Sequence, residues 1–230
     1  MSTLAVDIGG TSIKLVVLDD QGEALGESTI HETPRPAEPD TVIQLIHDVA
    51  DSLPPHRRIS VGFPGIVKDG VAYNAPNLGD DLWHGVRLRD RLMDLLGHPV
   101  RVVNDADLQG LGVVRGEGVE MAITLGTGMG TALFADGRLV PNLELGHHPF
   151  RDGHTYEDLV RDSELKRIGS EQWTLRVLDA LAQIEPIFNY DMLHLGGGNT
   201  RHITADLPAK VRIFLHDEAM SGAVKLWQSP

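Results

Sequence analysis

Two segments of this sequence follow one pattern: a short apolar run, a glycine-rich turn that contains a threonine, and a second apolar run. The first comprises Leu4–Asp7, Gly9-Gly10-Thr11 and Ile13–Leu18, and the second comprises Met121–Leu125, Gly126–Gly130 and Thr131–Ala135. Short apolar runs bounded by glycines predict strands, so each segment is predicted to be a hairpin with an unusual tip. The recurrence indicates that the second half of the chain repeats the plan of the first.

The two glycine turns have the composition of phosphate-binding loops. Glycines let backbone N–H groups approach an anion closely. Thr11 adds a hydroxyl donor, Lys14 adds positive charge, and Asp7 could hold a hydrated Mg²⁺. A single Gly-Gly-Thr segment is also typical of a plain turn. Two such loops facing one another across a cleft would clamp a phosphoryl chain from both sides, so their pairing favours the phosphate interpretation.

An Asn-Asp pair lies where a predicted strand meets a predicted helix. Val100–Val103 is a β-branched run suited to a buried strand, and Ala106–Gly112 has the composition of a helix start. Asn104 and Asp105 therefore fall at the carboxyl end of the strand, where α/β proteins bind ligands. Asp105 is the candidate for the residue that performs the chemistry. The alternative is that one of the two only caps the helix, since Asn and Asp lead the N-cap preferences.

Composition narrows the classes of function. The chain has 230 residues, 41% hydrophobic content, a net charge of −13 and no cysteine. This length suits one large domain or two small lobes. The negative charge argues against nucleic-acid and membrane partners, and the missing cysteines exclude disulfides, thiolate zinc sites and a cysteine nucleophile. The N-terminal segment lacks a basic and apolar leader pattern, so we expect a cytoplasmic protein.

The rest of the chain alternates further predicted strands and helices. Predicted strands are Ala24–Ile30, Ile59–Gly62, Met192–Leu195 and Val211–Leu215, and predicted helices begin at Thr41, Leu88, Glu171 and Glu218, the last ending at Trp227. Asp69-Gly70 suits a type I′ hairpin turn. The strand at Met192 runs into Gly196-Gly197-Gly198-Asn199, a third place where bare backbone could approach a ligand.

Two polar loops contain groups that could meet a sugar. Asn74–Gly79 could present a side-chain amide to a hydroxyl, although surface turns have the same composition. Glu144–His148 places a carboxylate and an imidazole close together. Such a run can serve as sugar ligand, metal ligand or general base, and it also occurs in ordinary surface loops.

Six motifs occur together in the order typical of one family. They are DIGGTSIK at Asp7–Lys14, GFPGIV at Gly62–Val67, VNDAD at Val103–Asp107, TLGTGMGTAL at Thr124–Leu133, ELGHH at Glu144–His148 and LGGGN at Leu195–Asn199. With these motifs the chain resembles a ROK-family sugar kinase over nearly its whole length. The resemblance implies the actin-like, ribonuclease H-like α/β fold with two lobes.

The resemblance also implies roles for individual residues. Asp105 would be the catalytic base, and Asn104, Glu144 and His147 would bind the sugar, with Asn77 and the Gly65 backbone as further candidates. The implied phosphate- or nucleotide-binding residues are Asp7, Gly9, Gly10, Thr11, Lys14, Gly126, Thr127, Gly128, Gly130, Gly196, Gly197 and Gly198. The expected reaction transfers a phosphoryl group to the 6-hydroxyl of a hexose, with glucose as the leading candidate. Mg²⁺ would be the cofactor, with Asp7 as its ligand, and the chain would form a homodimer.

One departure from the family pattern is informative. Many members follow the Glu-x-Gly-His run with a zinc loop of three cysteines, which this chain lacks, so no structural zinc is expected. A second sugar-binding Glu that normally follows that loop has no secure counterpart, Glu157 being the nearest guess. The zinc-free form is similar to the polyphosphate glucokinase branch. The sequence opens directly on the first phosphate strand, so we do not expect a transcriptional regulator.

The resemblance leaves the phosphoryl donor open between polyphosphate and ATP. A polyphosphate chain needs a basic track, and Arg151, Arg161, Lys166 and Arg167 could line one. Acidic residues are interspersed among them, so the stretch could equally be a solvated helix face. The competing function is a non-catalytic sugar-binding protein that retains the kinase fold. The lobes are expected at residues 1–112, joined by a C-terminal helix over 217–230, and at residues 113–216, closing on the sugar.

Overall fold

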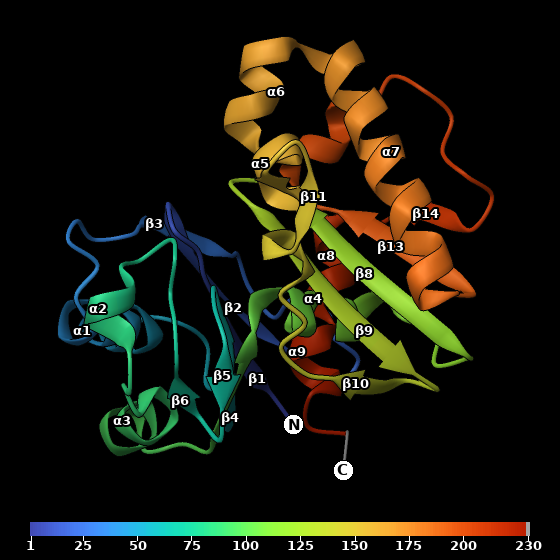
Figure 1. The fold of residues 1–230 in the computed structure, drawn as a ribbon. Helices are drawn as coiled ribbons and strands as arrows, with labels where there is room; N and C mark the ends of the chain where they lie inside the picture. Colours follow the sequence, from blue (N-terminus) through green and yellow to red (C-terminus); the bar gives the residue numbers. More distant parts are fainter. Residues whose placement is uncertain (229–230) are drawn as a thin grey trace. The chain divides into compact units, whose positions relative to one another are not determined.

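The computed structural model of this chain describes residues 1–228 (Figure 1). The chain folds as two compact units: unit 1 is Met1–Gly112 with the C-terminal segment from Met220, and unit 2 is Val113–Ala219. Each unit has one five-stranded mixed sheet and its own hydrophobic core, which confirms the predicted α/β class. Within residues 1–228, no helix is long and apolar enough to cross a membrane.

The sheet of unit 1 has the strand order β3-β2-β1-β4-β7. These strands are β1 (Thr3–Ile8), β2 (Ser12–Leu18), β3 (Thr29–Glu32), β4 (Arg58–Phe63) and β7 (Val100–Asn104). The other elements are α1 (Pro39–Ala50), β5 (Val67–Lys68), β6 (Val71–Ala72), α2 (Asp80–Trp83), α3 (Leu88–Leu96), α4 (Asp105–Val113) and α9 (Gly222–Lys225). β1 pairs antiparallel with β2 and parallel with β4, and β4 pairs parallel with β7.

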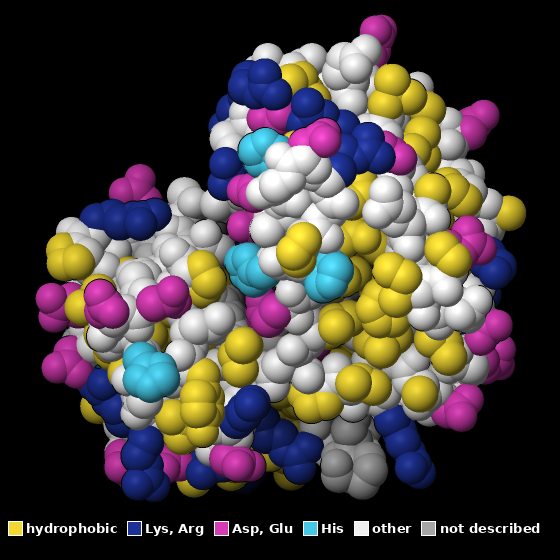
Figure 2. Space-filling model, in the orientation of Figure 1, with side chains coloured by type: hydrophobic (Ala, Val, Ile, Leu, Met, Phe, Trp, Pro, Cys, Tyr) yellow, Lys and Arg dark blue, Asp and Glu magenta, His cyan; other side chains and the backbone are white. Residues whose placement is uncertain are grey.

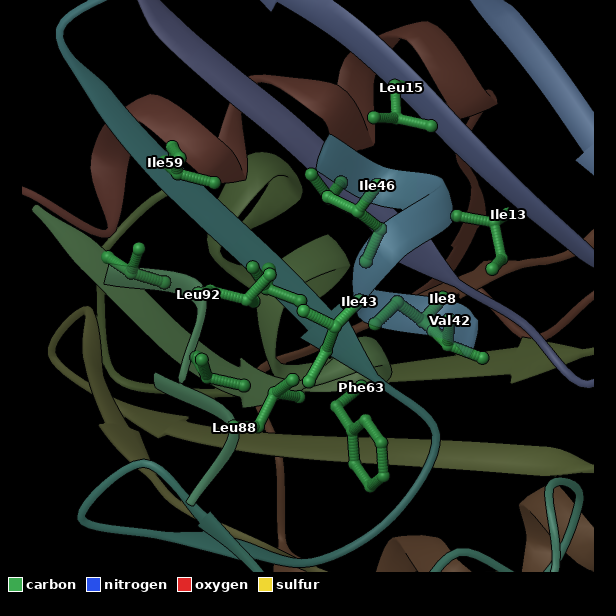
Figure 3. Packing of buried hydrophobic residues seen from close by; sticks show 14 of the residues in the cluster. Ile8, Ile13, Leu15, Val42, Ile43, Ile46, Ile59, Phe63, Leu88 and Leu92 are labelled. Atoms are coloured by element: carbon green, nitrogen blue, oxygen red, sulfur yellow. The ribbon is translucent and has the colours of Figure 1, made fainter. Parts of the chain in front are cut away.

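The core of unit 1 lies between this sheet and helices α1 and α3. Ile46 on α1, Leu92 on α3 and Ile59 on β4 belong to one cluster of buried residues, shown in Figure 3. Each fully buried Ile or Leu contributes about 1.5–3 kcal/mol relative to an exposed one. Because strand side chains alternate between the two faces, Ala5 and Asp7 lie on the opposite face of the sheet.

The second face of this sheet receives the C-terminal segment. The Ser60 hydroxyl on β4 donates to the Ala223 carbonyl at 2.6 Å and accepts from the Trp227 indole at 2.8 Å. A Cβ at Gly222 would overlap the Leu108 carbonyl oxygen, so the backbones of α9 and α4 are in direct contact. The Arg101 guanidinium stacks over the Trp227 ring at 4.8 Å. The end of the chain therefore completes the packing of unit 1.

The sheet of unit 2 has the strand order β10-β9-β8-β13-β14. These strands are β8 (Val119–Leu125), β9 (Met129–Ala135), β10 (Arg138–Val140), β13 (Met192–Gly196) and β14 (Val211–Ile213). The other elements are 3₁₀ helix η1 (Leu145–His147), β11 (Pro149–Arg151), β12 (His154–Thr155), α5 (Tyr156–Val160), α6 (Asp162–Ile168), α7 (Ser170–Phe188), 3₁₀ helix η2 (Gly198–His202) and α8 (His216–Met220). Helix α7 buries Trp173, Val177 and Leu181 in the core of this unit.

A buried polar cluster lies on the other face of the unit 2 sheet. The Glu120 carboxylate on β8 lies 2.7 Å from His194 Nε2 on β13 and accepts the Gly116 N–H at 2.7 Å. Arg212 Nε on β14 donates to His194 Nδ1 at 2.7 Å. His194 is therefore the neutral Nε2–H tautomer, and burial lowers its pKa. Arg212 also donates to Glu218 at 2.9 Å.

Four elements differ from the prediction. The strand predicted from Ala24 begins only at Thr29, because Ala24 forms a single bridge with Leu18 before the exposed segment around Gly26. The strand predicted over Val211–Leu215 ends at Ile213. Gly130 belongs to β9 and pairs with Thr124, so the second turn is shorter than predicted. The predicted C-terminal helix is split into α8 and α9, and Gly222 at the start of α9 packs against α4.

Candidate functional site

The first glycine loop, Gly9–Thr11, is a tight turn between β1 and β2. The Gly9 N–H donates to the Ser12 carbonyl at 2.9 Å. A Cβ at Gly9 would lie 2.8 Å from that same oxygen, and one at Gly10 would lie 2.8 Å from Asn77 Cβ. Neither position therefore accommodates a side chain. The structure brings the predicted residues Gly10 and Asn77 into contact and leaves bare backbone at the tip.

Two side chains that the sequence did not single out hold this loop. Thr33 Oγ1 donates to the Gly9 carbonyl at 2.6 Å, and Arg35 Nη2 donates to the Gly10 carbonyl at 2.5 Å. The Thr33 N–H also donates to the Thr11 carbonyl at 3.0 Å. These bonds connect residues more than twenty positions apart, so no local sequence pattern indicates them.

Asn104 and Asp105 lie at the junction of β7 and α4, as predicted. Asn104 Oδ1 accepts the N–H groups of Ala106 at 2.8 Å and Asp107 at 3.2 Å, so Asn104 does cap the helix. Its Nδ2 donates to the Gly65 carbonyl at 3.2 Å, which brings these two predicted residues together. Asp105 is the first residue of α4, and one carboxylate oxygen accepts the Ala106 N–H at 2.8 Å. The cap fixes the backbone that carries Asp105.

Asp7 and Asp105 share one face of the unit 1 sheet. Asp7 lies opposite Lys14 on β2 and opposite Gly62 on β4. A Cβ at Gly62 would lie 3.3 Å from the Cα of Asp105 and 3.2 Å from Leu108 Cδ2. Gly62 thus leaves room for the start of α4 beside Asp7. An ammonium group and two carboxylates on one face form a site of mixed charge, which suits a phosphoryl group with a cation.

This face fits Mg²⁺ only with help from a substrate. Within residues 1–228, no three His, Asp or Glu side chains are grouped so that they could hold a metal ion by themselves. Mg²⁺ commonly takes one or two carboxylates and fills its other positions with phosphate oxygens and water. Asp7, with Asp105 on the same face, matches that donor set.

The second glycine loop, Gly126–Gly128, is also fixed by long-range bonds. The Gly126 carbonyl accepts the Asn199 side-chain amide at 3.1 Å and the Asp162 N–H at 2.9 Å. A Cβ at Gly128 would overlap a carboxylate oxygen of Glu157. That oxygen also accepts the Met129 N–H at 2.9 Å. An acidic group therefore lies directly against this loop, and Thr127 at its tip is exposed.

The third glycine segment, Gly196–Gly198, has three different environments. Gly196 ends β13, and a Cβ there would overlap the ring of Phe214, so its backbone is covered rather than open as predicted. Gly197 has a φ of 91° and lies against the Leu125 backbone, so this segment packs onto the strand that leads into the second glycine loop. A Cβ at Gly198 would meet nothing within 4 Å, and this residue keeps the predicted access.

Glu144, His147 and Glu157 form the polar group beside the second glycine loop. A carboxylate oxygen of Glu144 lies 3.4 Å from His147 Nε2. Burial raises the pKa of the Glu144 carboxyl; the positive charge of protonated His147 opposes the shift, and the Glu157 charge adds to it. Glu157 lies in the first turn of α5, which the reciprocal bonds between Thr155 and Asp158 cap. Glu157, the candidate for the second sugar-binding Glu, thus has a fixed position next to the predicted sugar ligands.

The proposed basic track is charge-paired in the structure. Figure 2 shows dark blue side chains over α5 and α6 at the top of the view, with magenta side chains among them. The ion pairs are Arg151–Asp179, Arg161–Asp158, Lys166–Asp162 and Arg167–Glu164. Each cation therefore has an acidic partner, which favours the alternative of a solvated helix face over an open track.

Most of the site residues described above lie within the part of the chain that matches a known family. The sequence profile of the ROK family matches residues 3–158. The chain belongs to the ROK family. The match ends within unit 2 and includes the first two glycine loops, Asn104–Asp105, Glu144, His147 and Glu157.

Curated relatives of this ROK protein have names that include a phosphoryl donor and a sugar. A polyphosphate glucokinase of Mycobacterium leprae is 33% identical over 88% of this chain, and the chain covers 65% of that protein's length. A polyphosphate glucokinase of Mycobacterium tuberculosis H37Rv is 32% identical over 85% of this chain, with 77% of its own length covered. The chain therefore spans about two thirds to three quarters of these relatives.

A solved structure extends the likeness to the whole fold. The inorganic polyphosphate/ATP-glucomannokinase of Arthrobacter sp. strain KM has a TM-score of 0.88 and 30% identity, with 99% of each chain covered. This likeness confirms the predicted actin-like, ribonuclease H-like fold of sugar kinases.

Proposed function

We propose that this ROK protein is a sugar kinase that transfers a phosphoryl group from polyphosphate, ATP or both to the 6-hydroxyl of a hexose, with glucose preferred. The observation that carries the proposal is the position of Asp105. It starts α4 on a capped backbone, on the same sheet face as Asp7 and Lys14. The names of the mycobacterial and Arthrobacter relatives support the same reaction and the same donors.

Asp105 acts as the general base in this mechanism. Its carboxylate accepts the proton of the attacking sugar hydroxyl as the new oxygen–phosphorus bond forms, while the bond from phosphorus to the bridging oxygen breaks and the shortened polyphosphate or ADP leaves. The bond from the Ala106 N–H to one carboxylate oxygen fixes the orientation of the group. Asn104 and the Gly65 backbone hold the sugar near it, and Asn77 lines the adjoining loop against Gly10.

The glycine loops hold the phosphoryl donor. The tip of the first loop offers N–H groups of Gly10 and Thr11, with the charge of Lys14 on the neighbouring strand. Gly126, Thr127, Gly128 and Gly198 are the corresponding candidates in unit 2. Mg²⁺ held by Asp7 would neutralise charge on the donor oxygens. Lys14, opposite Asp7 in the ladder, supplies a second positive charge to the same group.

The sugar hydroxyls are bound by Glu144, His147 and Glu157. Two carboxylates and an imidazole provide several acceptors and one or two donors, which matches a ring of hydroxyl groups. Sites of this kind reject sugars that lack or misplace a hydroxyl, because a buried polar group is then left unpaired. We expect Glu144→Ala to raise the sugar KM and to weaken discrimination between epimers.

The deciding assay measures glucose phosphorylation with ATP and with polyphosphate separately, with Mg²⁺, over a range of salt concentrations. Activity with either donor supports the proposal. Polyphosphate activity that falls steeply with salt would indicate an electrostatic track that the paired cations do not predict. Calorimetric sugar binding without turnover on any donor would instead support a non-catalytic sugar-binding protein. Equal efficiency on every hexose would contradict a specific sugar site.

Two further properties belong to this proposal. We expect a homodimer, and we expect the two units to close when sugar binds. Small-angle scattering with and without glucose measures both the mass and the change in dimensions. A monomer of unchanged dimensions in both states would contradict both expectations.

A further inference from the structure

The carbonyl groups of the first glycine loop are held by one separate segment of unit 1. Thr33 Oγ1 donates to the Gly9 carbonyl at 2.6 Å, and Arg35 Nη2 donates to the Gly10 carbonyl at 2.5 Å. Thr33 is 4% exposed, so its hydroxyl has a fixed partner in a dry environment. Both bonds fix the loop from the same segment, between β3 and α1.

These two bonds determine where the loop's N–H groups point. In a trans peptide the C=O of one residue and the N–H of the next lie in the same plane and point in opposite directions. The carbonyl of Gly9 faces Thr33, so the N–H of Gly10 points away from it. The carbonyl of Gly10 faces Arg35, so the N–H of Thr11 also points away. Successive N–H groups presented in this way form an anion-binding concavity.

Arg35 also differs in its charge pairing from the four cations of the predicted basic track. Its side chain is exposed, and no Asp or Glu in residues 1–228 forms an ion pair with it. The four cations of the predicted track each have an acidic partner. In a chain with a net charge of −13, a cation without an acidic partner at this loop raises the local potential for an anion. Its bond to the Gly10 carbonyl also polarises the peptide whose N–H belongs to Thr11.

We propose that Thr33 and Arg35 are positioning residues for the phosphoryl donor, which lock two peptide planes so that the N–H groups of Gly10 and Thr11 face the donor's phosphate oxygens. This inference rests on the proposed kinase function and adds to Lys14 a second cation at the loop, on the carbonyl side of the peptide whose N–H faces the donor. The two residues act by different means. Thr33 fixes geometry without charge, whereas Arg35 fixes geometry and adds charge.

Steady-state kinetics on four variants separate these contributions. Arg35→Gln is expected to raise the KM for polyphosphate or ATP about tenfold, leave the glucose KM unchanged, and flatten the dependence of the donor KM on salt. Thr33→Val, which keeps the shape and removes the hydroxyl, is expected to lower kcat/KM for the donor severalfold without changing the salt dependence. Thr33→Ser keeps a hydroxyl that can donate to the Gly9 carbonyl, and its activity is expected to match the wild type. Arg87→Gln is the matched control, because Arg87 is an exposed arginine of unit 1 whose guanidinium pairs with Asp90.

The outcome that overturns the inference is a wild-type donor KM and salt dependence in folded Arg35→Gln and Thr33→Val. Equal changes in the glucose KM and the donor KM would also overturn it, because a general loss of structure affects both. A wild-type protein that phosphorylates no sugar would refute the kinase function instead. The inference is then tested by measuring the affinity for inorganic tripolyphosphate by calorimetry. This affinity should fall in Arg35→Gln and stay unchanged in Arg87→Gln. An equal affinity in both variants would refute the inference.

Discussion

The sheets of the two units have the same topology, but different residues pack against the glycine that each has at an equivalent position. In both sheets, counted along the chain, the strand order is third, second, first, fourth, fifth, with the same parallel and antiparallel pairs. Gly62 on β4 and Gly196 on β13 occupy the same register position. Gly62 makes room for Asp105, whereas Gly196 makes room for the ring of Phe214. One fold therefore presents a carboxylate in unit 1 and a closed apolar surface in unit 2.

A second pair of equivalent positions shows the same divergence. Ser60 on β4 lies between Ala5 and Arg101, and His194 on β13 lies between Ala122 and Arg212. In unit 1 a neutral hydroxyl is satisfied by the C-terminal segment. In unit 2 a carboxylate and an imidazole are buried together. The shared topology fixes where a polar group is needed, and each unit satisfies that position with different chemistry.

The largest effect should come from removing the Asp105 carboxylate, which lies beside Gly62 where unit 2 has Phe214 beside Gly196. We expect Asp105→Asn to lower kcat about 10²- to 10⁴-fold, because the amide cannot accept the hydroxyl proton. The amide oxygen can still accept the Ala106 N–H, so the fold should be kept. Asp94→Asn on the exposed side of α3 is the control and should match the wild type. Near-normal turnover in Asp105→Asn would remove the functional distinction between the units.

The next effect concerns the buried Glu120 carboxylate of unit 2. Glu120→Ala should lower the free energy of unfolding of unit 2 by several kcal/mol, because it leaves the N–H groups of Arg115 and Gly116 and the buried Nε2–H of His194 without their acceptor, and each orphaned buried donor costs about 1–3 kcal/mol. The equivalent loss in unit 1, Ser60→Ala, should cost about 1 kcal/mol. Hydrogen exchange read by mass spectrometry reports each unit separately. Equal costs in the two units would show that the chemistry at this position does not matter.

The two equivalent glycines should respond in opposite ways. Gly196→Ala drives a methyl group into Phe214 and should cost about 1–3 kcal/mol of stability in unit 2. Gly62→Ala meets Leu108 and Asp105 at 3.2–3.3 Å, so it should cost less stability but lower kcat roughly tenfold by shifting Asp105. Thermal unfolding and steady-state rates of both variants test this. A stability loss in Gly62→Ala with full activity per folded molecule would contradict the comparison.

The smallest effect is a shift in pH dependence within unit 2. Because the folded pKa of Glu144 is raised above 4.5, the native state binds its proton more readily than the unfolded chain, and ionising Glu144 costs stability as pH rises through that window. Sugar binding needs the ionised form, so the glucose KM should rise on acidification already above pH 4.5. Glu157→Gln removes a repelling charge and should move this limb to lower pH.

The control for that shift is Glu171→Gln at the exposed start of α7. It should leave the pH profile of the glucose KM unchanged. A Glu157→Gln profile that coincides with the wild type would show that Glu157 exerts no electrostatic effect on Glu144.

Local sequence patterns predicted the elements that depend on local chemistry. The positions of both glycine turns, and the type I′ turn at Asp69-Gly70 with its positive φ angles, follow from residues near one another. The roles of Thr33, Arg35 and Asn199 depend on bonds that span more than twenty residues, which no local pattern encodes. The interruption between α8 and α9 likewise depends on the contact of Gly222 with α4.

The return of the chain from Met220 into unit 1 affects the order in which the protein is completed on the ribosome. Unit 2 is continuous from Val113 to Ala219, so all its residues are translated while unit 1 still lacks α9. Until then the Ser60 hydroxyl has neither the Ala223 carbonyl nor the Trp227 indole. Unit 1 therefore begins first and receives its last helix only after every residue of unit 2 has been translated.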